Sequence, residues 1–348
     1  MNEAIEIRKP DDWHVHLREG EMLNLVLPWT AGCFGRAMVM PNLSASGICT
    51  VSDALSYRQA IENRRLQAKL SADFQALMTV KITPQTLPEM MTEAKRAGII
   101  AGKLYPDGVT TGSEGGVSDF QALYPVLAAM QEVDLALSIH CELPGSPILT
   151  AEQDFIPILA DIIANFPKLR IVVEHLSSRT MLEYVLAAPA NVGATITAHH
   201  LVLTKDQVLN LSGRVMFAHR FCKPMAKEAN DQAALIKAVV SGFRKIWFGS
   251  DSAPHSRCDK KNKNPPAGVF SAPVVLPILA QIFEDAGQLD RLEAFTSQFG
   301  AEFYGLPLNK GSIRLEKKAW TVSCSVGEDS ATQVVPFFAG QRLDWQVV

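Results

Sequence analysis

Eight short apolar runs that alternate with longer helix-like stretches constrain the fold of this chain more than any other feature of its sequence. Each run is rich in aliphatic or β-branched residues, which is typical of a buried strand. The expected strands are Trp13–Val15, Arg36–Met40, Phe74–Val80, Ile99–Lys103, Leu135–His140, Leu169–His175, Val192–Thr197 and Ile246–Asp251. The expected helices lie near 52–69, 85–97, 118–131, 152–165, 178–187, 231–242, 273–285 and 289–299.

This alternation favours one α/β architecture. Strands separated by helices pair in parallel through right-handed crossovers, and eight such units close a (β/α)8 barrel of the TIM type. A doubly wound open sheet is the alternative, but no glycine-rich dinucleotide fingerprint follows the first strand. We therefore predict one barrel domain over 1–348. Its short C-terminal appendage, about 310–348, carries strand-like pieces at Trp320–Val326 and Gln333–Phe338.

Charge and cysteine usage exclude several function classes. Lys plus Arg number 33 against 36 for Asp plus Glu, so no basic field indicates nucleic acid or a membrane as partner. The charged N-terminus shows no signal peptide, and the uncharged stretch 264–283 contains four prolines, which favour a loop and a buried helix over a membrane span. The six cysteines form no CxxC pair. We expect reduced thiols, a cytoplasmic location and a small-molecule substrate.

The ends of the expected strands carry polar side chains. Because the carboxyl ends of parallel strands meet at one face of a barrel, where active sites are built, these side chains should gather there. Alternation along the first strand places His14 and His16 on the same side. The complete set is His14, His16, Lys103, His140, His175 and Asp251.

Each of these residues alone is better explained by a satisfied polar group in the core or at the rim of the barrel. For all six residues together this explanation is weaker, because each buried polar group without a hydrogen-bond partner costs roughly 1–3 kcal/mol of folding free energy. Neutral imidazoles and a carboxylate suit zinc or a similar divalent metal. Beside a dication the pKa of Lys103 should fall, and its neutral amine can add carbon dioxide to form a carbamate that bridges two ions. A salt bridge from Lys103 to Asp251 remains the alternative.

Several motifs together resemble the dihydroorotases of the amidohydrolase superfamily, in particular the shorter, single-function bacterial type. The resemblance extends from about residue 6 to 303–307, and weakly beyond. The motifs are Asp12-Trp13-His14-Val15-His16-Leu17-Arg18, Met40-Pro41-Asn42, Lys103-Leu104-Tyr105-Pro106, Thr110-Thr111 and Gly249-Ser250-Asp251-Ser252-Ala253-Pro254-His255.

The resemblance implies a binuclear zinc site. One Zn²⁺ would be held by His14, His16 and Asp251, and the second by His140 and His175. Lys103, carboxylated to N6-carboxylysine by carbon dioxide, would bridge the two ions. The net positive charge of such a site suits an anionic substrate.

The resemblance also implies a reaction. It is the reversible cyclisation of N-carbamoyl-L-aspartate to (S)-dihydroorotate and water in pyrimidine (UMP) biosynthesis, through a metal-bridging hydroxide with Asp251 as proton shuttle. Lower pH should favour cyclisation. A homodimer is expected from the family. Another cyclic amidase such as a hydantoinase, a mononuclear deaminase and an inactive barrel are the alternatives.

The same motifs imply which residues would contact the substrate. Arg18, Asn42 and His255 would bind the substrate carboxylate, although a surface salt bridge is the alternative for Arg18. Backbone groups of Lys223 and Ala267 would complete the pocket. Thr110 and Thr111 lie in the glycine-rich loop 108–116, which would close over the substrate or would otherwise serve as a plain βα connection.

Four other ligand-type residues are assigned no metal. His199 and His200 end the expected seventh strand, where neighbours face opposite ways. Cys222 lies near His219, but the spacing offers neither of them a partner for a metal site. We predict a structural role for His219 and Cys222, whereas one of His199 and His200 could line the pocket.

Overall fold

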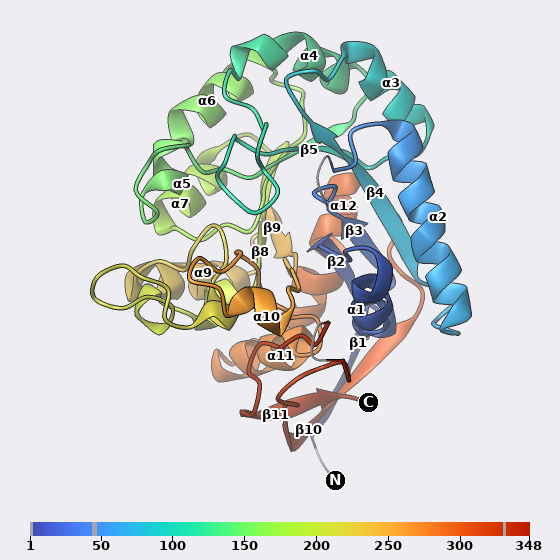
Figure 1. The fold of residues 1–348 in the computed structure, drawn as a ribbon, viewed down its shortest axis with the longest axis vertical. Helices are drawn as coiled ribbons and strands as arrows, with labels where there is room; N and C mark the ends of the chain where they lie inside the picture. Colours follow the sequence, from blue (N-terminus) through green and yellow to red (C-terminus); the bar gives the residue numbers. More distant parts are fainter. Residues whose placement is uncertain (1–2, 44–46, 330–331) are drawn as a thin grey trace.

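The computed structural model describes residues 3–43, 47–329 and 332–348. Its central feature is a sheet of eight parallel strands that follow one another around the barrel in sequence order (Figure 1). These strands are β2 (Asp11–Val15), β3 (Arg36–Val39), β4 (Gln75–Ile82), β5 (Ala101–Leu104), β6 (Ala136–Ile139), β7 (Ile171–Val173), β8 (Val192–Ile196) and β9 (Ile246–Phe248). Each predicted strand overlaps its observed counterpart, and the prediction of a (β/α)8 barrel is confirmed.

The barrel closes through the chain that follows β9 rather than through β9 itself. The amide of Asp251 donates to the carbonyl of His14 at 2.8 Å, and the amide of His16 donates to the carbonyl of Ser252 at 3.0 Å. Two predicted site residues, His14 and Asp251, are thus joined by a main-chain hydrogen bond. The main-chain hydrogen bonds that close the barrel therefore also hold these two site residues beside each other.

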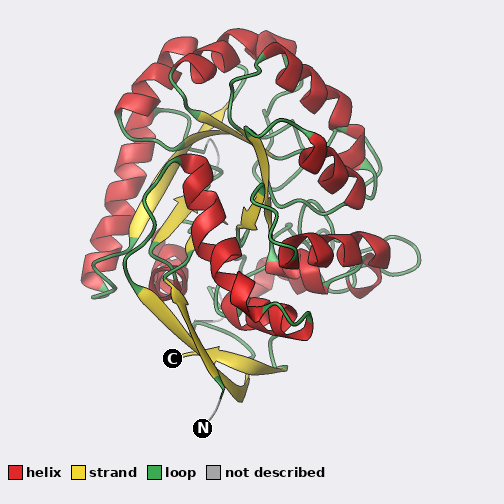
Figure 2. Cartoon of the chain, turned by 180° about the vertical axis from the view of Figure 1, so that it is seen from behind, coloured by secondary structure: helices red, strands yellow, loops and turns green. Residues whose placement is uncertain are grey.

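Helices surround the strands (Figure 2). They are α1 (Gly20–Cys33), α2 (Val51–Gln67), α3 (Pro88–Arg96), α4 (Tyr124–Glu132), α5 (Ala151–Asp154), α6 (Ile156–Asn165), α7 (Arg179–Ala187), α8 (Ala198–Val202), α9 (Ala229–Val240), α10 (Arg257–Lys260), α11 (Val275–Asp285) and α12 (Phe299–Tyr304). The sequence prediction lacked α1, whose apolar residues show little helical periodicity and which contains Pro28. The single helix expected near 152–165 is divided into α5 and α6, and that near 289–299 becomes a 3₁₀ turn and a π-helical segment before α12.

Helix α12 and the segment after it cover the amino end of the barrel. The ring of Trp13 stacks on Tyr304 with centroids 4.6 Å apart. A Cβ at Gly300 would lie 2.1 Å from the Trp13 ring, so this close approach requires glycine. Arg36 donates two hydrogen bonds to the Asp11 carboxylate at 2.6 and 2.8 Å. The amino end is therefore packed and charge-paired, which leaves the carboxyl end for chemistry.

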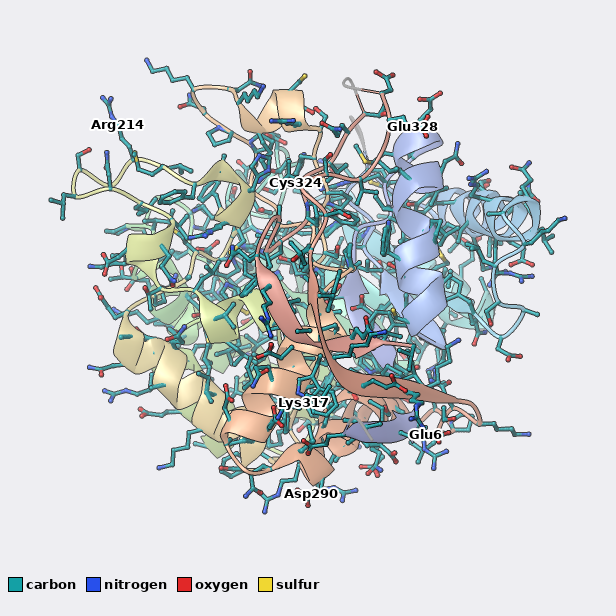
Figure 3. The ribbon with its side chains drawn as sticks, turned by 90° about the horizontal axis from the view of Figure 1, so that it is seen from below. Glu6, Arg214, Asp290, Lys317, Cys324 and Glu328 are labelled. Carbon is teal, nitrogen blue, oxygen red and sulfur yellow. The ribbon has the colours of Figure 1, made fainter. Side chains whose placement is uncertain are left out.

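The C-terminal tail forms a small antiparallel sheet with the N-terminus. Its strands are β1 (Ala4–Arg8), β10 (Ser312–Thr321) and β11 (Arg342–Val347), in the order β1-β10-β11. The strand-like pieces expected at 320–326 and 333–338 are only partly confirmed, because the first overlaps β10 at Trp320 and Thr321 alone, and the two pieces meet in one isolated bridge between Val326 and Val334. Figure 3 views this sheet from below, with Glu6 on β1 and Lys317 on β10 labelled. Among the described residues, no helix is both long and apolar enough to cross a membrane.

Candidate active site

A cavity of about 350 Å³ opens at the carboxyl ends of the strands. It gathers most of the residues that the sequence singled out. Its lining includes His14, His16, Arg18, Asn42, Thr110, Thr111, His140, His175, Lys223, Asp251 and Ala267. Lys103 lies buried among the histidines, with its ammonium group 4.9 Å from the centroid of the Tyr105 ring. His255 contacts Arg18.

One group of ligand-type atoms comes from the barrel seam. His14 lies in β2, His16 just beyond it and Asp251 just after β9. Asp251 Oδ1 lies 3.1 Å from His16 Nε2 and 3.5 Å from His14 Nε2. The ligand atoms of all three residues lie within 4.8 Å of one another, so a small adjustment would let them share one cation.

The second group faces the first across the cavity. His140 follows β6 and His175 follows β7, with ring centroids 4.7 Å apart. The His175 ring also lies 4.9 Å from that of His14. Burial lowers the pKa of both His140 and His175, so their imidazoles are neutral and able to bind a metal near neutral pH.

Lys103 is fully buried in β5 and near enough to the four cavity histidines for its charge to lower their pKa values. Within the described ranges, its Nζ has no hydrogen-bond partner. Burial lowers the pKa of Lys103 to about 8, against the opposing charges of Glu174 and Asp251. Among the described residues, Lys103 forms no salt bridge with Asp251. A buried amine with a low pKa is suited to reaction with carbon dioxide, and the resulting carboxylate would suit two cations.

Arg18 and its neighbours form the polar wall of the cavity. Arg18 Nε donates to the carbonyl of Pro254 at 3.0 Å, and its Nη2 lies 3.1 Å from His255 Nε2. Burial, and secondly the Arg18 charge, lowers the pKa of His255 to about 2, so this imidazole is neutral. These contacts hold the guanidinium at the cavity, where it can meet a carboxylate.

The glycine-rich loop is folded over the cavity. The Ala267 amide donates to Thr111 Oγ1 at 3.1 Å, and Asn42 Nδ2 donates to the Thr111 carbonyl at 3.2 Å. Lys81 Nζ donates to the carbonyl of Gly112 at 3.2 Å. The loop is therefore docked onto three separate segments of the barrel.

Comparison with known proteins agrees with this geometry. The amidohydrolase family model matches residues 74–261. A dihydroorotase from Shewanella denitrificans is 43% identical over 353 residues and is matched over 99% of both sequences. The chain belongs to the dihydroorotase family.

Solved structures extend the agreement to the whole fold. Dihydroorotase from Campylobacter jejuni superposes with a TM-score of 0.90 at 37% identity, over 100% of this chain and 98% of that one. Dihydroorotase from Saccharomyces cerevisiae, in complex with 5-fluoroorotic acid, gives a TM-score of 0.90 at 35% identity, over 99% and 98%. As a member of this family, the chain is a hydrolase acting on a cyclic amide.

Two buried carboxylates that the sequence reading missed orient histidines of this dihydroorotase-family site. Glu174 Oε2 accepts from His14 Nδ1 at 2.7 Å, and Glu142 Oε2 accepts from His140 Nε2 at 2.7 Å. Burial acts to raise the pKa of each carboxyl, but the histidine contacts outweigh it and both pKa values lie below normal. Each ring therefore presents one defined nitrogen to the cavity. The sequence did contain a signal for both carboxylates, because Glu174 directly precedes His175 and Glu142 follows His140 by two residues.

Half of the described non-glycine residues with a positive φ angle belong to this site. Arg18, His175 and Asp251 have φ angles of 60°, 42° and 41°, in the left-handed region that side chains other than glycine rarely adopt. Such strain persists only where the surroundings impose it, and Asp12 supplies part of that constraint. Its carboxylate accepts from the amide of Ser250 at 2.8 Å and from its hydroxyl at 2.6 Å.

The structure corrects the prediction for His199, His200 and Cys222. The two histidines lie in helix α8 rather than at a strand end, because Thr197 Oγ1 accepts from the His200 amide and caps that helix. Cys222 Sγ lies 3.6 Å from His200 Nε2. The three residues have ligand atoms within 4.8 Å of one another, so Cys222 does have ligand-type neighbours.

Proposed function

We propose that this chain catalyses the reversible cyclisation of N-carbamoyl-L-aspartate to (S)-dihydroorotate and water, the ring-forming step that pyrimidine (UMP) biosynthesis requires. The observation that carries the proposal is the buried amine of Lys103, set among four histidines and Asp251 with Arg18 at the cavity wall. Family membership supports the reaction class. The 5-fluoroorotic acid bound by the yeast relative supports a ring carboxylate as ligand.

The proposed metal centre contains two Zn²⁺ ions and carboxylated Lys103. The donor set supports it, because neutral imidazoles, Asp251 and a lysine-derived carboxylate match the ligands that zinc prefers. His14, His16 and Asp251 would hold one ion, and His140 and His175 the other, with Lys103 shared. Such ions would supply an acidified water and would polarise a substrate carbonyl.

Asp251 has the position for proton transfer. Its carboxylate faces His14 and His16 at the cavity floor, and its backbone is fixed by the hydrogen bond to the His14 carbonyl. In the cyclising direction, Asp251 takes the proton from the attacking ureido nitrogen and delivers it to the departing oxygen. In hydrolysis, Asp251 takes a proton from water and gives it to the ring nitrogen.

Substrate binding is assigned to the polar wall. The Arg18 guanidinium, held by Pro254 and His255, would pair with the substrate carboxylate through its remaining donors. Asn42 would add a contact from the far side, and the backbone groups of Lys223 and Ala267 would bind the ring amide edges. Only a ring that carries a carboxylate would pair with the Arg18 guanidinium of this wall.

The loop 108–116 is proposed as a lid. Thr110 and Thr111 line the cavity, and the Thr111 hydroxyl is bonded to the backbone of Ala267. Substrate bound at Ala267 would compete for the same groups. Closure over substrate would exclude water from the reacting atoms, and opening would release product.

The assembly and location are also proposals. We propose that 1–348 acts as one unit with its tail as an appendage, supported by the hydrogen bond from Trp345 Nε1 to Glu284 Oε2 at 3.0 Å.

A homodimer is proposed from the family resemblance, and the exposed apolar side chains Leu211 and Phe217 offer a surface for it. They lie on either side of Arg214, which Figure 3 shows at the molecular edge. A cytoplasmic location is supported by the cysteines, none of which forms a disulfide in the described chain.

Substrate competition tests the proposed function against a hydantoinase. Zinc-loaded protein is assayed for ring opening of dihydroorotate and of unsubstituted hydantoin under equal conditions. We expect kcat/KM to favour dihydroorotate by at least about 100-fold, because hydantoin has no carboxylate for Arg18 to bind. Equal or reversed preference would overturn the assignment.

A further inference from the structure

A second cluster of ligand-type side chains lies beside the proposed zinc site and takes no part in the proposed reaction. His199 and His200 stand in α8, and Cys222 precedes Lys223 in the chain. All three residues are buried. One ligand atom of each lies within 4.8 Å of those of the other two.

His199 gives this cluster a second, independent feature. Its side chain is fully buried, and neither Nδ1 nor Nε2 has a hydrogen-bond partner among the residues that the structure describes. Burying an unsatisfied polar group costs about 1–3 kcal/mol. The ring lies beside His200, with centroids 4.7 Å apart. A cation bound by these neighbours would engage one of the His199 nitrogens and recover part of that cost.

The spacing of His200 and Cys222 already suits a metal. His200 Nε2 and Cys222 Sγ are 3.6 Å apart. In a tetrahedral zinc site, Zn–N and Zn–S bonds of about 2.1 and 2.3 Å place N and S about 3.6 Å from each other. The carbonyl oxygen of Pro224, 2.9 Å from His200 Nε2 and 3.3 Å from Cys222 Sγ, lies near enough to serve as a fourth donor.

We propose that His199, His200 and Cys222 bind a divalent cation of the zinc class, at a site separate from the one built around Lys103. The cation would join α8 to the segment that carries Lys223, which lines the substrate cavity. Its role is structural, since it fixes one cavity wall to the barrel. Cation and protein would then contribute together to the folded state.

Cation binding at this site releases a proton. Burial raises the pKa of the Cys222 thiol to about 12, so this cysteine carries its proton near neutral pH. Burial lowers the pKa of His200 to about 4, so its imidazole is neutral. Its Nε2 donates to the Pro224 carbonyl, so binding of a cation through Nε2 requires that proton to move to Nδ1, which lies 2.9 Å from Thr197 Oγ1. Cation binding displaces the thiol proton as the metal–sulfur bond forms, and one proton is released.

Cobalt substitution tests the proposal in the full-length protein. The protein is stripped with a chelator, loaded with Co²⁺ under reducing conditions, and examined by absorption spectroscopy and metal analysis. Thiolate ligation gives a sulfur-to-cobalt charge-transfer band in the near ultraviolet, whereas the ligands around Lys103 contain no sulfur. We expect this band in the wild-type protein, and its loss in Cys222→Ser together with one cobalt ion per chain.

Matched variants make the result specific. Cys141→Ser removes another buried thiol, beside His140, and should keep the band. His199→Ala should weaken cobalt binding at the sulfur-containing site by at least about tenfold. A loaded wild-type protein without the band would overturn the proposal, as would a band that persists in Cys222→Ser. The wild-type spectrum decides even where a variant folds poorly, and it is independent of turnover.

Discussion

His14 Nδ1 lies 2.7 Å from Glu174 Oε2, and both side chains are buried. Glu174 also accepts hydrogen bonds from the hydroxyls of Ser138 and Thr195. A carboxylate that is fixed by two hydroxyls and accepts from one imidazole nitrogen defines the tautomer of that imidazole. The other nitrogen, Nε2, is then left as the electron-pair donor toward the cavity.

Glu174→Gln should weaken metal binding without unfolding the protein. The amide keeps the size of the side chain but loses the charge that makes His14 a better donor, and outer-shell changes of this kind typically cost 10–100-fold in affinity. Zinc competition against a chelator measures the effect. Glu183→Gln, an exposed carboxylate on α7, is the control and should match wild type. Unchanged zinc affinity in Glu174→Gln would contradict the role.

Lys103→Ala should lose bound metal and activity together. The substitution removes the group proposed to join the two ions, so neither ion keeps its full set of ligands. Metal content after dialysis should fall from two ions per chain at the Lys103 site toward zero, and turnover should fall at least about 1000-fold. Lys237→Ala on the exposed face of α9 serves as control. A variant that retained turnover would remove Lys103 from the mechanism.

Asp251→Asn should keep the fold and abolish most turnover. The amide fits the same space but neither accepts nor releases a proton near neutral pH, and loss of a general acid–base group costs about 100- to 10,000-fold in kcat. Circular dichroism checks the fold, and steady-state assays in both directions check the rate. Asp290→Asn, at the molecular edge labelled in Figure 3, should be neutral. Wild-type kcat in Asp251→Asn is the outcome that would refute proton transfer by this residue.

Arg18→Lys should impair substrate capture more than chemistry. Lysine keeps the charge but loses the planar fork that Pro254 and His255 hold in place. We expect kcat/KM for dihydroorotate to fall about 10- to 100-fold, mostly through KM. Arg58→Lys on the exposed side of α2 is the matched change. A fall confined to kcat would mean that Arg18 acts on the reacting atoms instead.

Carbamate formation on the metal-free protein should rise with pH. Burial lowers the pKa of Lys103 to about 8 from its ordinary value of 10.5, and only the neutral amine reacts with carbon dioxide. Protonation blocks the reaction below that pKa, so uptake should increase as pH rises from about 7 to 9. Carbon-13 NMR with labelled bicarbonate follows the signal, and Lys103→Ala should lack it. A signal that decreased over this range would contradict the sign of the effect.

The barrel could be predicted from sequence because its strands are buried on both faces. Such strands are continuous apolar runs, as in Ile171–Val173, and polar side chains at their ends stand out. His14, His140 and Asp251 were found for this reason. The helix α1 was missed because its apolar residues surround most of its circumference, which removes the helical periodicity that a sequence pattern needs.

The same sequence patterns could not predict contacts between segments that lie far apart in the chain. Cys222 contacts His200 across 22 positions of the chain, and a Thr197 cap instead of strand continuation sets the directions of both histidines. The pairing of β1 with β10 joins residues about 300 positions apart. Alternation within one segment carries no information on such contacts, so the tail strands were predicted only in part.

Diffraction at the zinc absorption edge, from crystals of the zinc-loaded protein, tests the proposed metal centre. We expect two anomalous peaks on either side of Lys103, one beside His14, His16 and Asp251 and the other beside His140 and His175. We also expect planar density for a carboxylate on Lys103 Nζ between them. A single peak at this site, or an unmodified lysine that contacts neither metal, would contradict the proposed centre.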